Sequence, residues 1–201
     1  MIHTIVFDIG NVLAHFRWRE YLEECGYTEE MKRKIGKATV LSSRWHELDR
    51  GVIDETKLIA ACGKEEPSVE KEILKLFEDA SKIVQEYEYS SELVRRLKAN
   101  GYRVYLLSNY ARFSFAYAKE NFEFIKYVDG GVISYEVKCT KPEAKIYHIL
   151  IEKYGIKPEE AVFLDDLPAN LEGAKPFGFK TIQVTSFEQI INDLRALGVR
   201  I

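Results

Sequence analysis

A set of polar residues spread along the chain carries the side chains that phosphoryl transfer requires. Each lies at the end of an apolar segment or at the start of a helical one, and the set is Asp8, Ser108, Asn109, Lys141, Asp165 and Asp166. An ionised aspartate is a nucleophile toward phosphorus, and a hydroxyl with neighbouring backbone N–H groups can hold phosphate oxygens. A lysine offsets the negative charge of the nucleophile and the phosphate. The residue types therefore indicate phosphoryl-transfer chemistry, on the condition that the fold brings them together.

The carboxylates in this set also indicate a metal ion. Packed together without a cation, Asp8, Asp165 and Asp166 would repel one another and take up protons, at about 1.4 kcal/mol for each unit of upward pKa shift. Mg²⁺ prefers oxygen ligands and usually keeps several waters, so one or two carboxylates, a backbone carbonyl and a substrate phosphate suffice. We therefore expect Mg²⁺ as the cofactor, with Lys141 offsetting the remaining negative charge.

The segments that precede several of these residues have the composition of buried parallel strands. Thr4–Phe7 is a β-branched and aromatic run that stops at Asp8, and residues 103–107 and 161–164 are apolar runs that also end in polar residues. Parallel strands place their carboxyl ends along one edge of a sheet, where open α/β folds carry their chemistry. The polar side chains are therefore expected to meet at that edge.

From residue 89 onward the sequence alternates between helical and extended patterns. It predicts helices near 90–97, 111–122, 142–154, 171–175 and 187–197, and strands near 103–108, 127–137, 161–165 and 181–184. Alternation of this kind is typical of a parallel sheet covered by helices on both faces. The predicted fold is α/β, a three-layer Rossmann-like parallel sheet.

Residues 17–88 interrupt this pattern with sequence that is almost wholly helical. Local stops separate its helices, at Gly26, Gly51, Gly63 and the Glu66-Pro67 step. Because this block follows the first strand, we expect a core domain of residues 1–16 and 89–201 and an inserted helical bundle of residues 17–88. The bundle would lie over the carboxyl edge of the sheet.

Composition limits the classes of partner. The chain has 201 residues, 46% hydrophobic and 30% charged, with a net charge of −3 and an isoelectric point near 5.9. A basic face for nucleic acid or anionic membrane is not indicated, and no apolar run approaches the roughly 18 residues of a membrane span. The three cysteines form no CxxC pair, which favours reduced thiols. We expect a cytoplasmic protein whose partner is a small-molecule phosphate ester.

The order of the polar segments resembles the four motifs of the haloacid dehalogenase superfamily. The segments are Val6-Phe7-Asp8-Ile9-Gly10-Asn11-Val12, Leu106-Leu107-Ser108-Asn109, Lys141-Pro142-Glu143 and Phe163-Leu164-Asp165-Asp166. The resemblance implies a phosphatase in which Asp8 forms an aspartyl-phosphate, Ser108 and the Asn109 amide bind phosphate, and Lys141 is the motif lysine. It also implies that residues 17–88 are the helical cap of this superfamily. The Mg²⁺ ligands that it implies are Asp8, the Gly10 carbonyl, Asp166 and, through water, Asp165.

Gly10 departs from the pattern of most phosphatases in that superfamily. They carry a second aspartate two residues after the nucleophile, which protonates the leaving oxygen, and loss of such a general acid commonly costs about 10²- to 10⁴-fold in rate. An anomeric leaving group depends less on this acid, and Phe7-Asp8-Ile9-Gly10-Asn11-Val12 looks like the motif of a bacterial subgroup that includes an α-glucose-1-phosphate phosphatase. A sugar phosphate such as a hexose 1-phosphate is therefore one candidate substrate, and His15 is one candidate proton donor.

Two other functions fit part of the sequence. A 2-haloacid dehalogenase of the same fold also lacks the second aspartate but needs no metal, so Asp165 and Asp166 argue against it. A non-catalytic module that binds a phosphorylated ligand is the second alternative, and Gly10 permits it. Measurement of phosphate release with and without Mg²⁺ separates both from a phosphatase.

Overall fold

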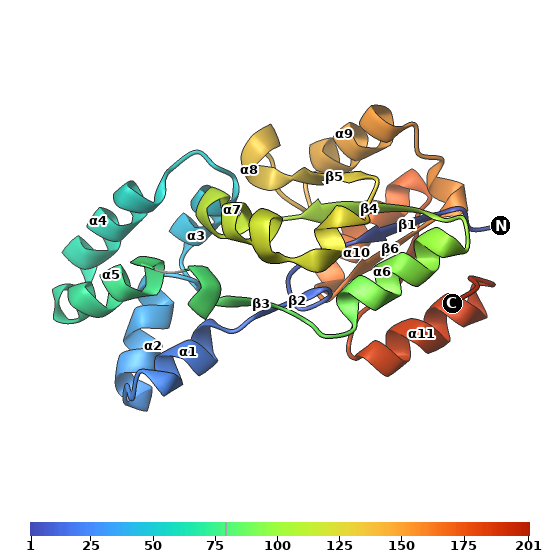
Figure 1. Cartoon of the computed structure of the whole chain (residues 1–201). Helices are drawn as coiled ribbons and strands as arrows, with labels where there is room; N and C mark the ends of the chain where they lie inside the picture. The colour runs from blue at the N-terminus through green and yellow to red at the C-terminus, as the bar shows by residue number, and fades with distance from the viewer. Residues whose placement is uncertain (79) are drawn as a thin grey trace.

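The centre of the molecule is a five-stranded parallel sheet (Figure 1). The computed structural model describes residues 1–78 and 80–201. The strands occur in the order β5-β4-β1-β6-β7. They are β1 (Thr4–Phe7), β4 (Arg103–Ser108), β5 (Gly130–Ile133), β6 (Ala161–Asp165) and β7 (Lys180–Gln183).

The first strand lies between β4 and β6, and its register sets up the site. Phe7 pairs with Leu106 on one side and with Leu164 on the other. One residue further on, Asp8 is therefore level with Leu107 near the end of β4 and with Asp165 at the end of β6, at the carboxyl edge of the sheet. All four residues of β1 are buried, which explains their β-branched and aromatic composition.

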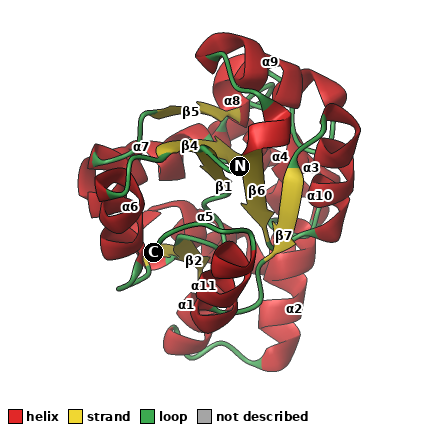
Figure 2. Ribbon diagram, turned by 90° about the vertical axis from the view of Figure 1, so that its right-hand side faces the viewer, coloured by secondary structure: helices red, strands yellow, loops and turns green. Residues whose placement is uncertain are grey.

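Helices cover both faces of the sheet, and alternate side chains of each strand face different helices. Ile5 and Phe7 pack in one apolar cluster with helices α6 (Ser90–Ala99), α7 (Arg112–Asn121) and α11 (Phe187–Ala196). Val6 points the other way and packs with α9 (Ala144–Tyr154) and α10 (Pro168–Ala174). Figure 2 shows the sheet between these two groups of helices. The three-layer α/β fold predicted from the sequence is confirmed.

Between β1 and β4 the chain forms a group of helices, here called the inserted helices, beyond the carboxyl ends of the strands (Figure 1). Side chains cap two of them at the N-terminus: Thr28 Oγ1 accepts a hydrogen bond from the Met31 N–H, and Asp54 Oδ1 accepts one from the Lys57 N–H. The inserted helices are α1 (Trp18–Glu24), α2 (Glu29–Ala38), α3 (Ser43–Asp49), α4 (Glu55–Glu65) and α5 (Glu70–Glu78). A short 3-10 turn lies at Pro67–Val69, between α4 and α5, and another at Ala80–Lys82, after α5.

The structure differs from the predicted elements at two places. Val84–Glu86 lies in the block expected to be helical, but it forms strand β3, antiparallel to β2 (Ala14–Phe16). Ser134–Val137 lies in a segment expected to be extended, but it forms the short helix α8, which ends at Lys138 in the left-handed region. In both cases contacts with distant residues outweigh the local pattern. Val84–Glu86 pairs with β2, and Ser134 forms hydrogen bonds with the Tyr110 N–H before α7 and with the Asp49 carbonyl at the end of α3.

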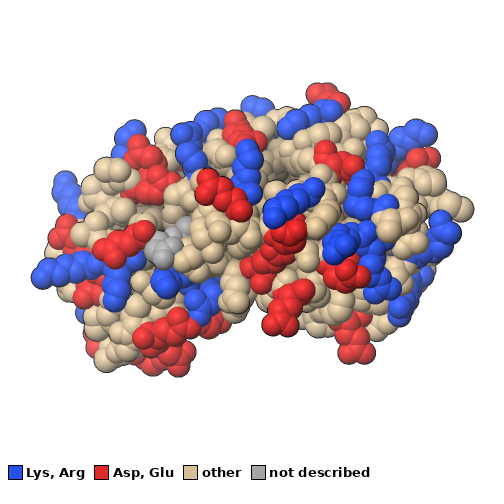
Figure 3. All heavy atoms as spheres, viewed as in Figure 1, with Lys and Arg blue, Asp and Glu red and all other residues tan. Residues whose placement is uncertain are grey.

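The surface carries charges of both signs. On the face shown in Figure 3, lysine and arginine side chains alternate with aspartate and glutamate side chains over both the sheet domain and the inserted helices. Within the described residues, no helix combines the length and the apolar character that crossing a membrane requires.

Candidate active site

Three carboxylates meet at the carboxyl edge of the sheet. One oxygen each from Asp8, Asp165 and Asp166 lies within 4.8 Å of the other two. Asp8 follows β1 and Asp165 ends β6, and the Asp8 N–H donates a hydrogen bond to the Leu164 carbonyl at 2.9 Å, which keeps the two strand ends side by side. Hard oxygen donors in this arrangement fit a divalent cation such as Mg²⁺.

Lys141 lies against the same carboxylates and is almost fully buried. Its Nζ is 2.9 Å from Asp8 Oδ1 and 2.6 Å from Asp165 Oδ2. Burial disfavours the ammonium, but the charges of Asp8 and Asp165 outweigh it and raise the pKa of Lys141. Burial also raises the pKa of Asp8 to about 7, against the opposing charge of Lys141. One lysine therefore does not fully offset the carboxylates, and a bound cation would favour ionised Asp8.

The two adjacent aspartates after β6 have different environments. Asp165 is fully buried, and its carboxylate accepts hydrogen bonds from the Asn170 side chain at 3.0 and 3.1 Å and from the Leu167 N–H at 2.8 Å, besides its contact with Lys141. Asp166 is half-buried and accepts one hydrogen bond, from Asn11 Nδ2 at 3.1 Å. Asp166 thus keeps oxygen lone pairs for a ligand, whereas those of Asp165 are largely used within the protein.

Ser108 is the last residue of β4 and Asn109 follows it, on the side of Asp8 opposite to β6. The Asn109 side chain binds the backbone of Lys141 at both of its ends, so the loop after β4 and the loop before α9 are joined. The Asn109 side chain is therefore occupied within the protein, which leaves its backbone N–H for a ligand. Ser108 Oγ is buried, and its partner in the site is the Asp8 carboxylate, which also pairs with Lys141. Buried oxygens with so few partners fit a site that binds a cation and a phosphate.

Gly10 lies in the same pocket. A Cβ built on it would meet no atom within 4 Å, and its φ lies outside the left-handed region. Its neighbour Asn11 has a φ of 54°, which asparagine tolerates better than most residues. The loop after β1 therefore has room for a side chain at position 10.

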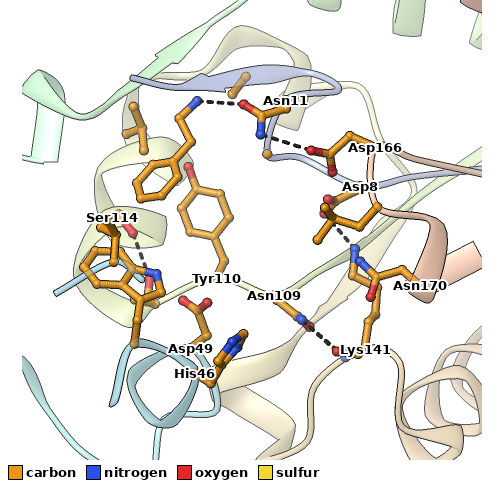
Figure 4. Close-up of a pocket in the computed structure, with 18 of the residues that line it drawn as sticks. Asp8, Asn11, His46, Asp49, Asn109, Tyr110, Ser114, Lys141, Asp166 and Asn170 are labelled. Atoms are coloured by element: carbon orange, nitrogen blue, oxygen red, sulfur yellow. Dashed lines mark hydrogen bonds and ion pairs between the residues drawn. The ribbon is translucent and has the colours of Figure 1, made fainter. Parts of the chain in front are cut away.

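A cavity of about 240 Å³ extends from the carboxylates to the inserted helices (Figure 4). Its polar end contains the residues described above, and Asn170 contributes there from α10. Its other end is mainly apolar. The apolar wall comprises Ala14, Phe16, Val40, Trp45, Val84 and Ala111.

The inserted helices also place one carboxylate in this cavity. Asp49, the last residue of α3, directs its side chain into the pocket near Tyr110 (Figure 4). Burial, followed by the charge of Asp8, raises the pKa of Asp49 to about 8, while Lys141 acts in the opposite direction. His15 lines the pocket as well, but its ring stacks on Tyr87 and its Nε2 lies 3.4 Å from Glu20.

The structure thus brings together the site residues predicted from the sequence. Sequence reasoning missed Asn11, Asp49 and Asn170. A Gly-Asn pair directly after a strand end could have drawn attention to Asn11, because asparagine tolerates left-handed backbone. No local signal marks Asn170 or Asp49, which lie on helices whose orientation depends on packing.

Comparisons with known proteins agree with this geometry. A model of the haloacid dehalogenase-like hydrolases matches residues 2–178. The chain is similar to a D-ribitol-5-phosphate phosphatase from Bacteroides thetaiotaomicron, with 27% identity over 201 residues, or 91% of this chain and 92% of that protein. It is also similar to a sesquiterpene phosphatase from Aspergillus oryzae, with 24% identity over 193 residues, or 96% of this chain and 94% of that protein.

Solved structures have the same fold. A HAD family enzyme from Bacteroides thetaiotaomicron, in complex with magnesium and inorganic phosphate, superposes with a TM-score of 0.73 at 24% identity, covering 93% of this chain and 96% of that one. Some relatives are much longer, and in one of them, 28% identical over 120 residues, the matched region is 11% of that protein. The chain corresponds to nearly the whole length of the two phosphatases.

Proposed function

The chain belongs to the haloacid dehalogenase-like hydrolase family, and on this premise we propose that it is a Mg²⁺-dependent phosphatase acting on a small phosphate monoester. The observation that carries the proposal is the approach of Asp8, Asp165 and Asp166 to within 4.8 Å of one another beside Lys141. Two relatives that match most of the chain are named as phosphatases, and a neighbour of the same fold binds magnesium and phosphate.

Asp8 is the proposed nucleophile. One of its carboxylate oxygens attacks phosphorus while the bond from phosphorus to the ester oxygen breaks, which gives an aspartyl-phosphate and an alcohol once a proton reaches the leaving oxygen. Water then cleaves the new bond and returns Asp8 as a carboxylate. Lys141, whose Nζ is 2.9 Å from Asp8 Oδ1, would offset the negative charge of the carboxylate before the attack and after its release.

The remaining polar residues hold the cation and the phosphate. Asp8, the Gly10 carbonyl and Asp166 would ligate Mg²⁺, and Asp165 would act through water and by fixing Lys141. Bound there, Mg²⁺ would neutralise charge on the nucleophile and the phosphate. Ser108 Oγ and the Asn109 N–H would hold phosphate oxygens, a role supported by the position of the buried Ser108 hydroxyl beside Asp8.

The inserted helices are proposed to act as a cap domain, residues 17–88, over a core of residues 1–16 and 89–201. Support comes from the cavity, which has walls from both parts of the chain. A cap that closes over the bound ester excludes bulk water while the aspartyl-phosphate forms.

Two substrate classes follow from different observations. The form of the first motif favours a sugar phosphate such as a hexose 1-phosphate, whose leaving group needs little acid assistance. The pocket favours the phosphate of an apolar alcohol, because the side chains of Phe16, Val40 and Val84 line the cavity beyond its polar end and cannot hydrogen-bond to sugar hydroxyls. We rank the apolar ester first on this ground.

A panel of phosphate esters, assayed with and without Mg²⁺, tests the function. It should include p-nitrophenyl phosphate, 2-phenylethyl phosphate and glucose 1-phosphate. We expect Mg²⁺-dependent phosphate release, faster for 2-phenylethyl phosphate than for glucose 1-phosphate. Absence of release from every ester would support a binding module, and chloride release from a 2-haloacid in the presence of EDTA would support a dehalogenase.

A further inference from the structure

Hydrolysis of an alkyl ester needs an acid, because an alkoxide is a poor leaving group unless it is protonated. In this chain Gly10 occupies the position from which the acid would come. The cavity contains other titratable side chains, but most are engaged. Asp8 and Lys141 pair with each other, Asp166 faces the cation position, and the His15 ring is held between Tyr87 and Glu20. Burial raises the pKa of Tyr110 far above neutral, which makes it a weak proton donor.

Building on the proposed phosphatase activity, we propose that Asp49 of the inserted helix α3 protonates the leaving oxygen in place of the residue absent at Gly10. Its carboxyl group points into the cavity from the side opposite Asp8 (Figure 4). Within the described residues it makes no hydrogen bond or ion pair of its own, so its proton is free for a substrate. Burial keeps the carboxyl protonated near neutral pH, as the acid role requires.

The backbone around Asp49 is fixed to the core by several contacts. The Ser134 hydroxyl donates a hydrogen bond to the Asp49 carbonyl and accepts one from the Tyr110 N–H at 2.9 Å. The Ser134 side chain therefore links the backbone of Asp49 to the loop that carries Ser108 and Asn109. Since a misplacement of about 1 Å is costly in catalysis, a fixed backbone is what an acid on a separate helix needs.

Contacts of Arg50 and Gly51 complete this attachment. The Arg50 guanidinium pairs with Glu143 and lies 3.2 Å from Thr140 Oγ1, on the loop that carries Lys141. Lys138 Nζ donates to the Gly51 carbonyl. Gly51 has a φ of +70°, and a Cβ there would lie 2.7 Å from the Tyr135 carbonyl oxygen, so only glycine allows this close approach. The end of α3 thus reaches the catalytic loops only when the inserted helices lie against the core.

The proposed reaction has two steps, and the Asp49 proton is returned in the second. Asp8 attacks phosphorus, the bond to the ester oxygen breaks, and the Asp49 proton moves to that oxygen, giving the alcohol and an Asp49 carboxylate. In the second step the carboxylate accepts a proton from the attacking water, and the bond between phosphorus and Asp8 breaks. Phosphate is released, with Asp8 ionised and Asp49 protonated again.

The test compares Asp49→Asn with wild type on two esters of different leaving group. We expect kcat for 2-phenylethyl phosphate to fall about 10²-fold or more and kcat for p-nitrophenyl phosphate to fall less than about tenfold, because nitrophenolate leaves without a proton. Glu47→Gln is the matched control, since Glu47 is an exposed carboxylate on the same helix and does not line the cavity. Inorganic phosphate and Mg²⁺ binding, measured by calorimetry, should be unchanged in Asp49→Asn.

Equal losses on both esters, or no loss on either, would overturn the acid role while leaving the phosphatase proposal intact. If His46→Gln, and not Asp49→Asn, lowered kcat for 2-phenylethyl phosphate selectively, that result would also overturn the acid role of Asp49, because His46 lines the same cavity. If Asp49→Asn does not fold, Asp49→Ala is judged by the same ratio of the two esters. Wild type that releases no phosphate from either ester would reject the proposed function itself.

Discussion

Asn109 binds the backbone N–H and the backbone carbonyl of Lys141 with the two ends of its side-chain amide. Asn109 Nδ2 donates to the Lys141 carbonyl at 3.0 Å, and Oδ1 accepts from the Lys141 N–H at 2.8 Å. Asn109, the residue after Ser108, therefore fixes the loop that carries Lys141, and hydrogen bonds join the two loops.

Replacing Asn109 should separate these loops. In Asn109→Ala, the Lys141 peptide loses two hydrogen bonds at a partly buried position, which costs about 1–3 kcal/mol when donor and acceptor stay unsatisfied. We expect a lower melting temperature and a lower kcat, with misplacement of Lys141 as the cause. Thermal unfolding and steady-state kinetics of Asn109→Ala check both, and Asn121→Ala, at the exposed end of α7, is the control for loss of an asparagine. Unchanged kcat would contradict the positioning role.

Asp8→Asn should abolish turnover while the fold persists. The amide has nearly the shape of the carboxylate but is not a nucleophile, so no aspartyl-phosphate can form. Phosphate release from p-nitrophenyl phosphate and circular dichroism are the measurements. Substantial remaining activity would assign the nucleophile to another residue.

Removal of Mg²⁺ with EDTA should stop turnover, and added Mg²⁺ should restore it. Asp166→Asn would weaken a proposed direct ligand, so half-maximal activity should need at least about tenfold more Mg²⁺. A magnesium titration of activity and of binding heat in wild type and variant measures this shift. An identical Mg²⁺ requirement in both proteins would exclude Asp166 as a ligand.

Gly10→Asp should raise turnover of alkyl phosphates more than that of aryl or anomeric ones. The position is open, since a Cβ there meets no atom within 4 Å. The clearest effect is expected in the Asp49→Asn background, where the new carboxyl restores the missing proton donor. The ratio of kcat for 2-phenylethyl phosphate to that for p-nitrophenyl phosphate is the readout. A uniform loss on both esters would mean that the loop does not tolerate a second carboxylate.

The pH dependence of alkyl ester hydrolysis should report on Asp49. Its pKa is raised to about 8 by burial and by the charge of Asp8, with Lys141 opposing; Tyr110 and the neighbouring His46 and Arg50 are the other titratable or charged groups near it. An acid must be protonated to donate, so kcat for 2-phenylethyl phosphate should fall as pH rises through this pKa. Asp49→Asn should lack this alkaline decline. The same decline in the variant would assign it to another group.

The sequence predicted the half of the site that lies at strand ends. Asp8, Ser108 and Asp165 follow apolar runs, and parallel pairing alone brings such positions to one edge of the sheet. Asp49 and Asn170 could not be predicted in this way, because their helices are oriented by packing and by distant contacts such as those of Ser134. Strands β2 and β3 have three residues each, too few for an alternating pattern.

Within the described residues, the chain passes between the sheet domain and the inserted helices along strands β2 and β3, which are paired antiparallel, with His15 opposite Gln85. Because the two passages are bonded to each other, we expect any movement of the inserted helices to occur as one body about this pair of strands. Admission of the ester, escape of the alcohol and arrival of Asp49, the proposed acid, would then depend on one motion. The proton would reach the leaving oxygen only while the inserted helices lie against the sheet domain.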